Sequence, residues 1–214
     1  LERGLAAKDM MLFLCRRHPM DPANYKALEF AAEAERALPM SERMVLANMA
    51  AELGAKVGLI APDRTTIDYV AAAGARVAAD WERWCSDTGA AFETLHRFDA
   101  GGLEPQVAAP HSPENAADVA AHAGVAIDQA YIGACPGAKL SDLGMAAAIL
   151  RGRKVAQGVR LLVAPASARI TQQAAADGTL AALAEAGAIL LPSGCGACAG
   201  YGAGILAENE VCIS

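Results

Sequence analysis

The sequence predicts an α/β fold in which mostly parallel, doubly wound sheets are flanked by helices. Apolar residues make up 54% of the 214 residues but aromatic residues only 5%. The apolar content is therefore mainly Ala, Leu, Val and Ile, a composition that suits helices packed around a parallel sheet. Short apolar runs of strand character also alternate with longer segments of helical periodicity, and this βαβα order favours parallel strands joined by helical crossovers.

The first part of the chain contains two alternations of strand and helix. Pro19 prevents the first helix from continuing, because proline lacks the amide hydrogen and clashes with the preceding turn. Gly54 is placed as a helix stop. In chain order we expect a helix at 5–18, a loop at 20–22, a strand at 25–30, a helix at 42–53, a strand at 56–61 and a helix at 65–73.

Periodicity weakens between residues 74 and 124, where glycines and prolines are typical of loops. We therefore divide the chain into a first α/β subdomain at 1–92, a loop-rich connection at 93–126 and a second α/β subdomain at 127–214. In the second subdomain the sequence predicts strands at 130–133, 161–164 and 188–191, with helices at 140–150 and 168–186.

Charge and cysteine content exclude several functional classes. The formal net charge is −6 and the sequence pI is about 5.2, without the basic surface that nucleic acids require. Apolar stretches are interrupted well before the ~20 residues that a membrane helix needs. Six cysteines in a chain with a sizeable core favour a reducing, cytoplasmic setting and thiols available for metal binding. The start at Leu1 without an initiator Met indicates an internal portion of a longer protein.

Three cysteines form the candidate site. Cys135 follows the predicted strand at 130–133, and Cys195 and Cys198 follow the strand at 188–191. Because the carboxyl ends of parallel strands open on one crevice, we expect the three thiols to converge. A structural zinc site requires four ligands. A [4Fe–4S] cluster held by only three cysteines would instead leave one iron open to bind a substrate as a Lewis acid.

The C-x-x-C spacing alone leaves other readings open, since redox pairs and zinc knuckles share it. The surrounding glycines, from Gly194 to Gly204, allow the backbone to approach a bulky cofactor. Cys15 is expected in the core, and packing is the better expectation for Cys85 and Cys212. The cations Arg151, Arg153 and Lys154 are better explained by a helix C-terminus than by a bound diacid.

Several ordered motifs resemble the aconitase superfamily, and within it the large subunits of 3-isopropylmalate dehydratase and homoaconitase. The chain looks like an internal portion of such a subunit. The motifs span nearly the whole sequence and comprise Tyr25-Lys26-Ala27-Leu28-Glu29-Phe30, Pro110-His111-Ser112-Pro113-Glu114-Asn115, Tyr131-Ile132-Gly133-Ala134-Cys135, Leu140-Ser141-Asp142-Leu143 and Gly194-Cys195-Gly196-Ala197-Cys198.

The resemblance implies an aconitase-type fold of two related subdomains and an iron–sulfur hydro-lyase acting on a small hydroxy di- or tricarboxylic acid. Cys135, Cys195 and Cys198 match the cysteines that hold the [4Fe–4S] cluster in the family, and Glu29 matches a glutamate near the active site. In the dehydratases a separate small subunit, the swivelling domain, carries the base, so we expect that partner. A role in leucine biosynthesis is also implied.

One departure from the family pattern keeps an alternative open. The family usually has Ser-Cys-Thr-Asn around the first ligand, whereas this chain has Ala134-Cys135-Pro136-Gly137. Two hydrogen-bonding side chains beside the cluster are thereby lost, and such groups tune metal sites. The alternative is a noncatalytic iron–sulfur or zinc-binding interaction module of the same fold.

Overall fold

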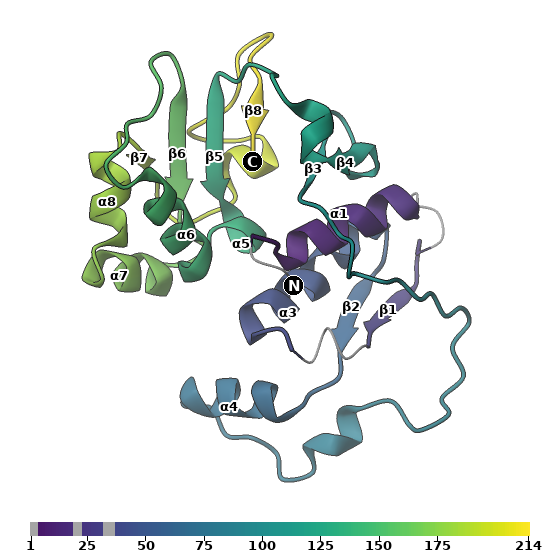
Figure 1. The fold of residues 1–214 in the computed structure, drawn as a ribbon. Coiled ribbons are helices and arrows are strands. Elements are labelled where there is room, and N and C mark those ends of the chain that lie inside the picture. The colour runs from purple at the N-terminus through teal and green to yellow at the C-terminus, as the bar shows by residue number, and fades with distance from the viewer. Residues whose placement is uncertain (1–3, 19–22, 32–36) are drawn as a thin grey trace. The chain divides into compact units, whose positions relative to one another are not determined.

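The computed structural model describes residues 4–18, 23–31 and 37–214, so the loop expected at 20–22 lies outside the described residues. The chain divides into two units, Leu1–Ala123 and Gly124–Ser214, which are treated separately below. Both units contain helices and parallel strands, which agrees with the α/β class (Figure 1). Within the described residues no helix combines the length and hydrophobicity of a membrane span.

The first unit is built around two parallel strands with one pair of packed helices. Strand β1 pairs with β2 in a register that places Glu29 opposite Leu59. The elements of this unit are α1 (Ala7–Arg17), β1 (Ala27–Phe30), α3 (Met40–Asn48), η1 (Met49–Leu53), β2 (Val57–Ile60), α4 (Arg64–Ala72), η2 (Trp81–Trp84), β3 (Gln106–Ala108), η3 (Pro113–Asn115), β4 (Ala116–Asp118) and η4 (Val119–His122).

The core of this unit lies between α1, α3 and the strand pair. Met11 and Cys15 of α1 pack in one cluster with Val45 and Leu46 of α3. Helix α3 and β2 approach closely at Gly58, where a Cβ would lie 2.5 Å from the Ala47 carbonyl oxygen. The predicted helices and strands of this unit are therefore present, and the helix after residue 42 ends through a 3₁₀ turn at Gly54.

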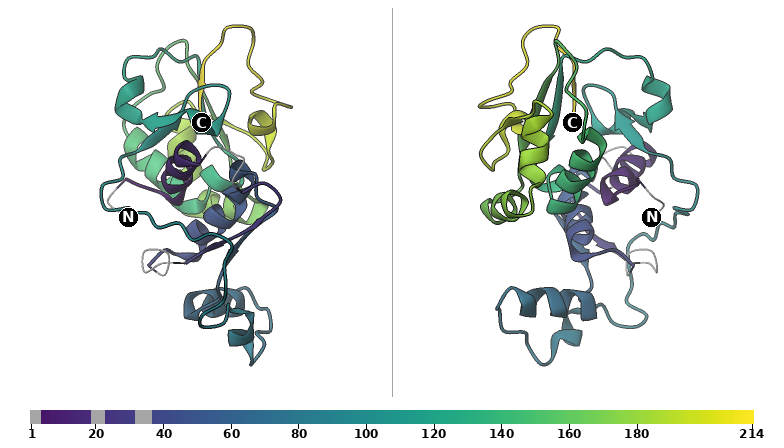
Figure 2. Two further views of the ribbon diagram at one scale, coloured as in Figure 1. Left: turned by 90° about the vertical axis from the view of Figure 1, so that its right-hand side faces the viewer. Right: turned by 60° about the vertical axis from the view of Figure 1, so that its left-hand side comes forward.

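Helix α4 projects away from this core, as Figures 1 and 2 show, and it has no buried residues. It is anchored by Asp63, whose carboxylate accepts from the Thr66 amide at 3.2 Å and pairs with Arg43 at 2.8 Å. The Arg43 side chain is 1% exposed and also donates to the Leu38 carbonyl. This ion pair therefore joins the buried face of α3 to the start of α4.

The weakly patterned region contains one small sheet that the sequence pattern did not reveal. Strands β3 and β4 pair in antiparallel fashion. The Gln106 amide at the start of β3 donates to Asp9 of α1 at 2.8 Å. Strands of three residues are too short to show an alternation of apolar and polar residues. The glycines and prolines of this region therefore predict loops, and they give no indication of the two strands.

The second unit contains a four-stranded, fully parallel sheet with the order β7-β6-β5-β8. Strands β5, β6 and β7 follow one another across the sheet, whereas β8 lies on the other side of β5. The elements are β5 (Gln129–Gly133), α5 (Ala134–Gly137), α6 (Leu140–Leu150), β6 (Arg160–Ala164), α7 (Ala168–Ala176), α8 (Thr179–Glu185), β7 (Ile189–Leu190), η5 (Gly196–Ala199) and β8 (Cys212–Ile213).

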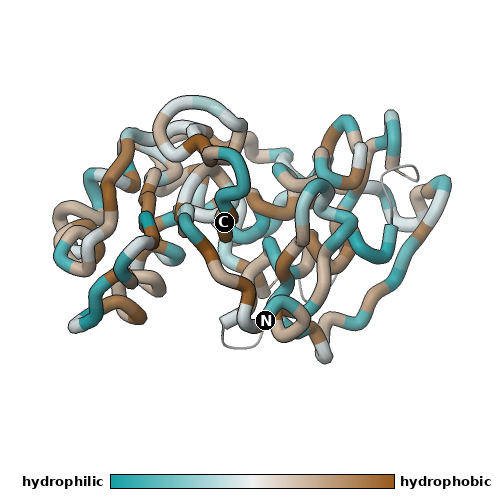
Figure 3. Tube along the Cα trace, turned by 90° about the horizontal axis from the view of Figure 1, so that it is seen from above, coloured by the Kyte–Doolittle hydropathy of each residue, from teal (hydrophilic) through white to brown (hydrophobic). Residues whose placement is uncertain are grey.

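The two faces of this sheet are covered differently. Leu161 and Val163 pack against residues of α6, α7 and α8. Leu162 and Ala164 point to the opposite face, where they pack with Tyr131 and with Ala197 of η5. Apolar residues on both faces make β6 a continuous hydrophobic run after Arg160. Figure 3 shows how hydrophobic and hydrophilic residues are distributed along the whole trace.

We expect Asp63→Asn to lower the free energy of unfolding by about 2 kcal/mol, because it removes the carboxylate charge that pairs with the buried Arg43 guanidinium. The Arg43 hydrogen bond holds the pKa of Asp63 below its ordinary value of 3.8. The stabilisation relative to Asp63→Asn is therefore fully present above a pH of about 4 and declines as the pH falls through the lower folded-state pKa. Urea titrations at several pH values measure both effects.

Asp68→Asn is the matched control, because Asp68 pairs with Arg64 on the surface of α4 with both side chains more than half exposed. Such a pair contributes less than about 0.5 kcal/mol. Equal urea midpoints for the two variants would contradict a structural role for the Arg43–Asp63 pair.

Candidate metal centre

The parallel sheet of the second unit brings the two cysteine-bearing loops to one edge. Strands β5 and β7 both run parallel to β6, so all three end at the same side of the sheet. Cys135 lies in α5, directly after β5, and Cys195 and Cys198 lie in the segment around η5, after β7. Segment 192–200, called the cysteine loop below, carries the C-x-x-C motif.

The cysteine loop is fixed to β5 by Tyr131, which is only 3% exposed. The Tyr131 hydroxyl donates to the Cys195 carbonyl oxygen at 3.1 Å. Burial raises the pKa of the Tyr131 phenol, and negative charge on Cys198, Cys195 and Tyr201 acts in the same direction. Tyr131 therefore lies close to both cysteines of the motif.

Tight turns shape the cysteine loop. The Cys198 amide donates to the Cys195 carbonyl at 3.0 Å, and the Tyr201 amide donates to the Gly196 carbonyl at 3.2 Å. Gly200 ends η5 with a φ of 73°, a left-handed conformation that glycine adopts without strain. The loop is thus held by its own backbone hydrogen bonds and by Tyr131.

Gly204 lies where the chain leaves this region and passes closely over the sheet. Its carbonyl accepts from the buried Gln129 side chain at 2.8 Å. A Cβ at Gly204 would lie 2.4 Å from Leu162 and 3.3 Å from Ala197. Only glycine therefore lets the backbone approach the face of the sheet that supports the cysteine loop.

The three candidate thiols are exposed and none forms a disulfide. In the described part of the chain, no three His, Cys, Asp or Glu side chains gather closely enough to hold a single metal ion. An iron–sulfur cluster binds its cysteines through different irons and spreads them farther apart than a single ion does. Three accessible thiols on two loops at one sheet edge have the donor chemistry of such a cluster.

The segment around Cys135 is supported by a lysine that the motif analysis did not single out. Lys139 is 7% exposed, donates to the Pro136 carbonyl at 2.9 Å and pairs with Asp142 at 2.7 Å. The sequence signal for the Lys139–Asp142 pair is an Asp three residues after a Lys at the start of a helical pattern. The contact of Lys139 with the Pro136 carbonyl has no such signal.

Glu29 lies in β1 of the first unit, apart in sequence from the thiols. Its Oε2 accepts a hydrogen bond from the Ser86 hydroxyl at 2.5 Å. The segment that carries Ser86 is tied to β1 a second time by an ion pair between Glu93 and Lys26 at 2.6 Å. Ser86 is a residue that sequence reasoning missed, because a contact over 57 residues leaves no periodic signal.

The other three cysteines have packing environments. Cys15 is fully buried, as expected, and burial raises its pKa to about 11. The Cys85 thiol lies 3.6 Å from the Pro62 carbonyl oxygen. Cys212 pairs with Gln129 at the amino end of β5, the edge opposite the one where Cys135 follows that strand.

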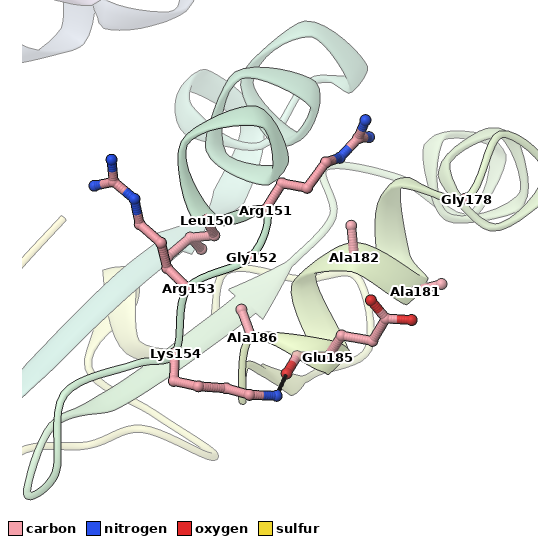
Figure 4. A pocket seen from close by; sticks show the side chains of 10 residues that line it. All are labelled: Leu150, Arg151, Gly152, Arg153, Lys154, Gly178, Ala181, Ala182, Glu185 and Ala186. Atoms are coloured by element: carbon pink, nitrogen blue, oxygen red, sulfur yellow. Dashed lines mark hydrogen bonds between the residues drawn. The ribbon is translucent and has the colours of Figure 1, made fainter.

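An open pocket of about 400 Å³ lies between the C-terminal end of α6 and one side of α8 and includes Arg151, Arg153 and Lys154 (Figure 4). The Lys154 ammonium donates to the Glu185 carbonyl at the end of α8. Figure 4 shows the two arginine side chains pointing away from each other. Lys154 thus lies at a helix C-terminus, but at that of α8 rather than that of α6, the helix it follows and for which the role was expected. The two arginines do not converge on an anion site in this pocket.

Comparison with known proteins places these residues in context. The model of the aconitase family (aconitate hydratase) matches residues 1–125 and 120–214. The chain is 42% identical over 214 residues to 3-isopropylmalate dehydratase large subunit 2 of Archaeoglobus fulgidus, covering 100% of this chain and 51% of that protein. It is 40% identical over 214 residues to the probable methanogen homoaconitase large subunit of Methanosarcina mazei, covering 100% of this chain and 54% of that protein. The chain spans about half the length of these curated relatives.

We expect Gly204→Ala to destabilise the second unit more than Gly202→Ala. Both glycines have positive φ values, 92° and 73°, so both substitutions add left-handed strain of roughly 1 kcal/mol. A Cβ at Gly202 meets nothing within 4 Å, whereas one at Gly204 collides with the buried Leu162. The collision adds about 1–3 kcal/mol of overpacking. Thermal unfolding of the pair measures the difference, and equal losses would contradict the close approach at Gly204.

Proposed function

The chain belongs to the aconitase family, and from this premise we propose that it is the cluster-binding part of an iron–sulfur hydro-lyase. Its relatives are named as large subunits of 3-isopropylmalate dehydratase and homoaconitase. The proposed substrate is a small hydroxy di- or tricarboxylic acid, and the proposed partner is a small subunit. We also propose a cytoplasmic protein whose fold comprises two related, doubly wound subdomains.

The observation that carries this proposal is the placement of three exposed thiols on two loops at one edge of a parallel sheet. Cys135 follows β5, and Cys195 and Cys198 follow β7. We propose these three cysteines as the ligands of a [4Fe–4S] cluster. The sulfur-only donor set favours iron–sulfur chemistry, because thiolates are the usual ligands of such clusters. A fourth cysteine is not supplied by Cys212, which lies at the opposite edge of the sheet.

When bound, a [4Fe–4S] cluster with one iron not held by cysteine supplies a Lewis acid for a departing hydroxyl. Dehydration breaks the C–O bond and a C–H bond on the neighbouring carbon, and yields water and an alkene diacid. Rehydration with the opposite regiochemistry gives the isomeric hydroxy acid. The exposed positions of the thiols support access of a small substrate to this edge.

For Glu29 we propose a role in proton transfer at the hydroxyl or water oxygen, whereas the base that acts on the C–H bond is expected on the small subunit. The Ser86 hydroxyl engages Oε2 at 2.5 Å and thereby restricts the rotation of the carboxylate. Oε1 is then the oxygen proposed to exchange a proton. A positioned carboxylate is effective in such a role because the geometry for transfer is formed before the reaction begins.

The altered segment around Cys135 favours a second candidate function. Ala134, Pro136 and Gly137 provide no side-chain hydrogen bonds to a bound cluster. A noncatalytic module that binds a cluster or zinc at the same cysteines is the corresponding proposal. Metal analysis and an activity assay separate the two, because a zinc-binding module contains zinc without iron or sulfide.

Protein purified anaerobically, or reconstituted with iron and sulfide, is expected to hold about four irons and four sulfides per chain. Cys198→Ser should lose most of this content, because an alcohol replaces one proposed thiolate ligand. Cys212→Ser is the matched control in the same unit and should retain it. Iron, acid-labile sulfide and zinc are measured on the same samples. A full cluster in Cys198→Ser would contradict the ligand assignment.

In the intact protein paired with its small subunit, Glu29→Gln is expected to lower kcat for hydration of a cis-alkene diacid by about 10²–10⁴. The iron content should stay unchanged, because Glu29 is not a proposed ligand. Alkene absorbance measures turnover. Glu93→Gln, in the segment that also carries Ser86, is the control and should change kcat little. A wild-type kcat for Glu29→Gln would show that Glu29 has no role in proton transfer.

A further inference from the structure

Tyr131 connects the two loops that carry the candidate thiols. It lies in β5, four residues before Cys135, and its hydroxyl reaches the Cys195 carbonyl at 3.1 Å. We propose that Tyr131 is a positioning residue that fixes the cysteine loop against β5, the strand that leads to Cys135. Its importance for metal binding rests on the cluster function proposed above, whereas its hold on the loop can be tested without a metal.

The space around the Tyr131 ring is formed by two glycines, one on each segment that it joins. A Cβ at Gly133 would lie 2.1 Å from the ring, so the ring passes directly over this residue of its own strand. A Cβ at Gly196 would lie 3.3 Å from the hydroxyl oxygen. Gly133 lies two residues before Cys135 and Gly196 follows Cys195. The ring is therefore in contact with the backbone beside both halves of the candidate site.

Burial gives the Tyr131 hydroxyl a strong preference for this one partner. At 3% exposure the phenol has little access to water, and a buried tyrosine hydroxyl usually finds a hydrogen-bond partner. Here the partner is the carbonyl of Cys195, whose oxygen also accepts from the Cys198 amide. The same carbonyl thus links the phenol to the turn that sets the spacing of the two cysteines.

The hydrogen bond of Tyr131 connects two loops that are far apart in the sequence. The candidate ligands lie 60 residues apart in the sequence and on loops that follow non-adjacent strands, with β6 between β5 and β7. The loops must be fixed before a metal centre binds, because ordering them on binding would lower the affinity. Ala197 packs on the face of the sheet beside Tyr131 and adds apolar contact. The hydrogen bond of the Tyr131 hydroxyl joins β5 directly to the cysteine loop.

The test compares Tyr131→Phe with Tyr201→Phe in the full-length protein. Both substitutions remove one phenol hydroxyl and keep the ring, but Tyr201 is 56% exposed. In the cluster-free protein, Tyr131→Phe should accelerate amide hydrogen exchange in residues 196–201 and alkylation of Cys195 by about threefold to tenfold, the effect of losing one net hydrogen bond. Tyr201→Phe should match the wild type, and both variants should keep the wild-type circular dichroism spectrum.

Gly133→Ala provides a second variant, which keeps the hydroxyl but displaces the ring. It should produce the same change in exchange and alkylation of the cysteine loop. In reconstituted protein, Tyr131→Phe and Gly133→Ala should also lose iron to a chelator several-fold faster than Tyr201→Phe. Wild-type exchange, alkylation and iron release in both variants would overturn the proposal.

The experiment distinguishes failure of the proposed cluster function from failure of the proposed positioning role of Tyr131. If the wild type takes up no iron, the cluster function fails, and the exchange and alkylation rates of the cluster-free protein still decide whether Tyr131 holds the loop. If the wild type binds a cluster but Tyr131→Phe matches Tyr201→Phe in all three measurements, the positioning role is overturned and the cluster function stands.

Discussion

The parallel pairing of β5 and β6 is the constraint on which the rest of the second unit depends. Its register places Tyr131 opposite Leu162 and Gly133 opposite Ala164. These residues form the face that receives the cysteine loop, while Leu161 and Val163 face the helices. A shift of one residue would exchange the two faces and remove the support of the loop. The support of the cysteine loop at the carboxyl edge is thus a consequence of strand register.

Much of this architecture could be predicted from the sequence because hydrophobic periodicity is a local property. The run at 161–164 predicted a strand that agrees with β6, and the glycine after residue 53 predicted a helix stop that agrees with the left-handed Gly54. The rule that parallel strands end at one edge agrees with the parallel pairing of β5, β6 and β7, after which Cys135 and Cys195 follow. Convergence of the thiols themselves stays a prediction, since in the described residues no three metal-binding side chains gather around one ion position. The assignment of these cysteines as ligands stays a prediction.

The contacts that hold the site could not be predicted, since they join residues far apart in the chain. The Tyr131–Cys195 and Ser86–Glu29 hydrogen bonds span 64 and 57 residues. Periodicity identifies Tyr131 as a strand residue but does not reveal which carbonyl its hydroxyl meets. Likewise, the buried Arg43 belongs to a helix pattern, but its partner Asp63 lies beyond the next strand. Such contacts depend on tertiary structure, which a local pattern does not contain.

The segment around Cys135 is held through its backbone carbonyls. Ala134 adopts a left-handed φ of 62°, which costs about 1–2 kcal/mol for a residue with a Cβ. Lys139 contacts the same segment by donating to the Pro136 carbonyl, and Asp142 pairs with the buried ammonium of Lys139. The Ala138 carbonyl accepts from the Ala166 amide and ties the segment to the end of β6. These contacts fix the backbone on the C-terminal side of Cys135, while Ala134, Pro136 and Gly137 place no polar side chain beside the thiol.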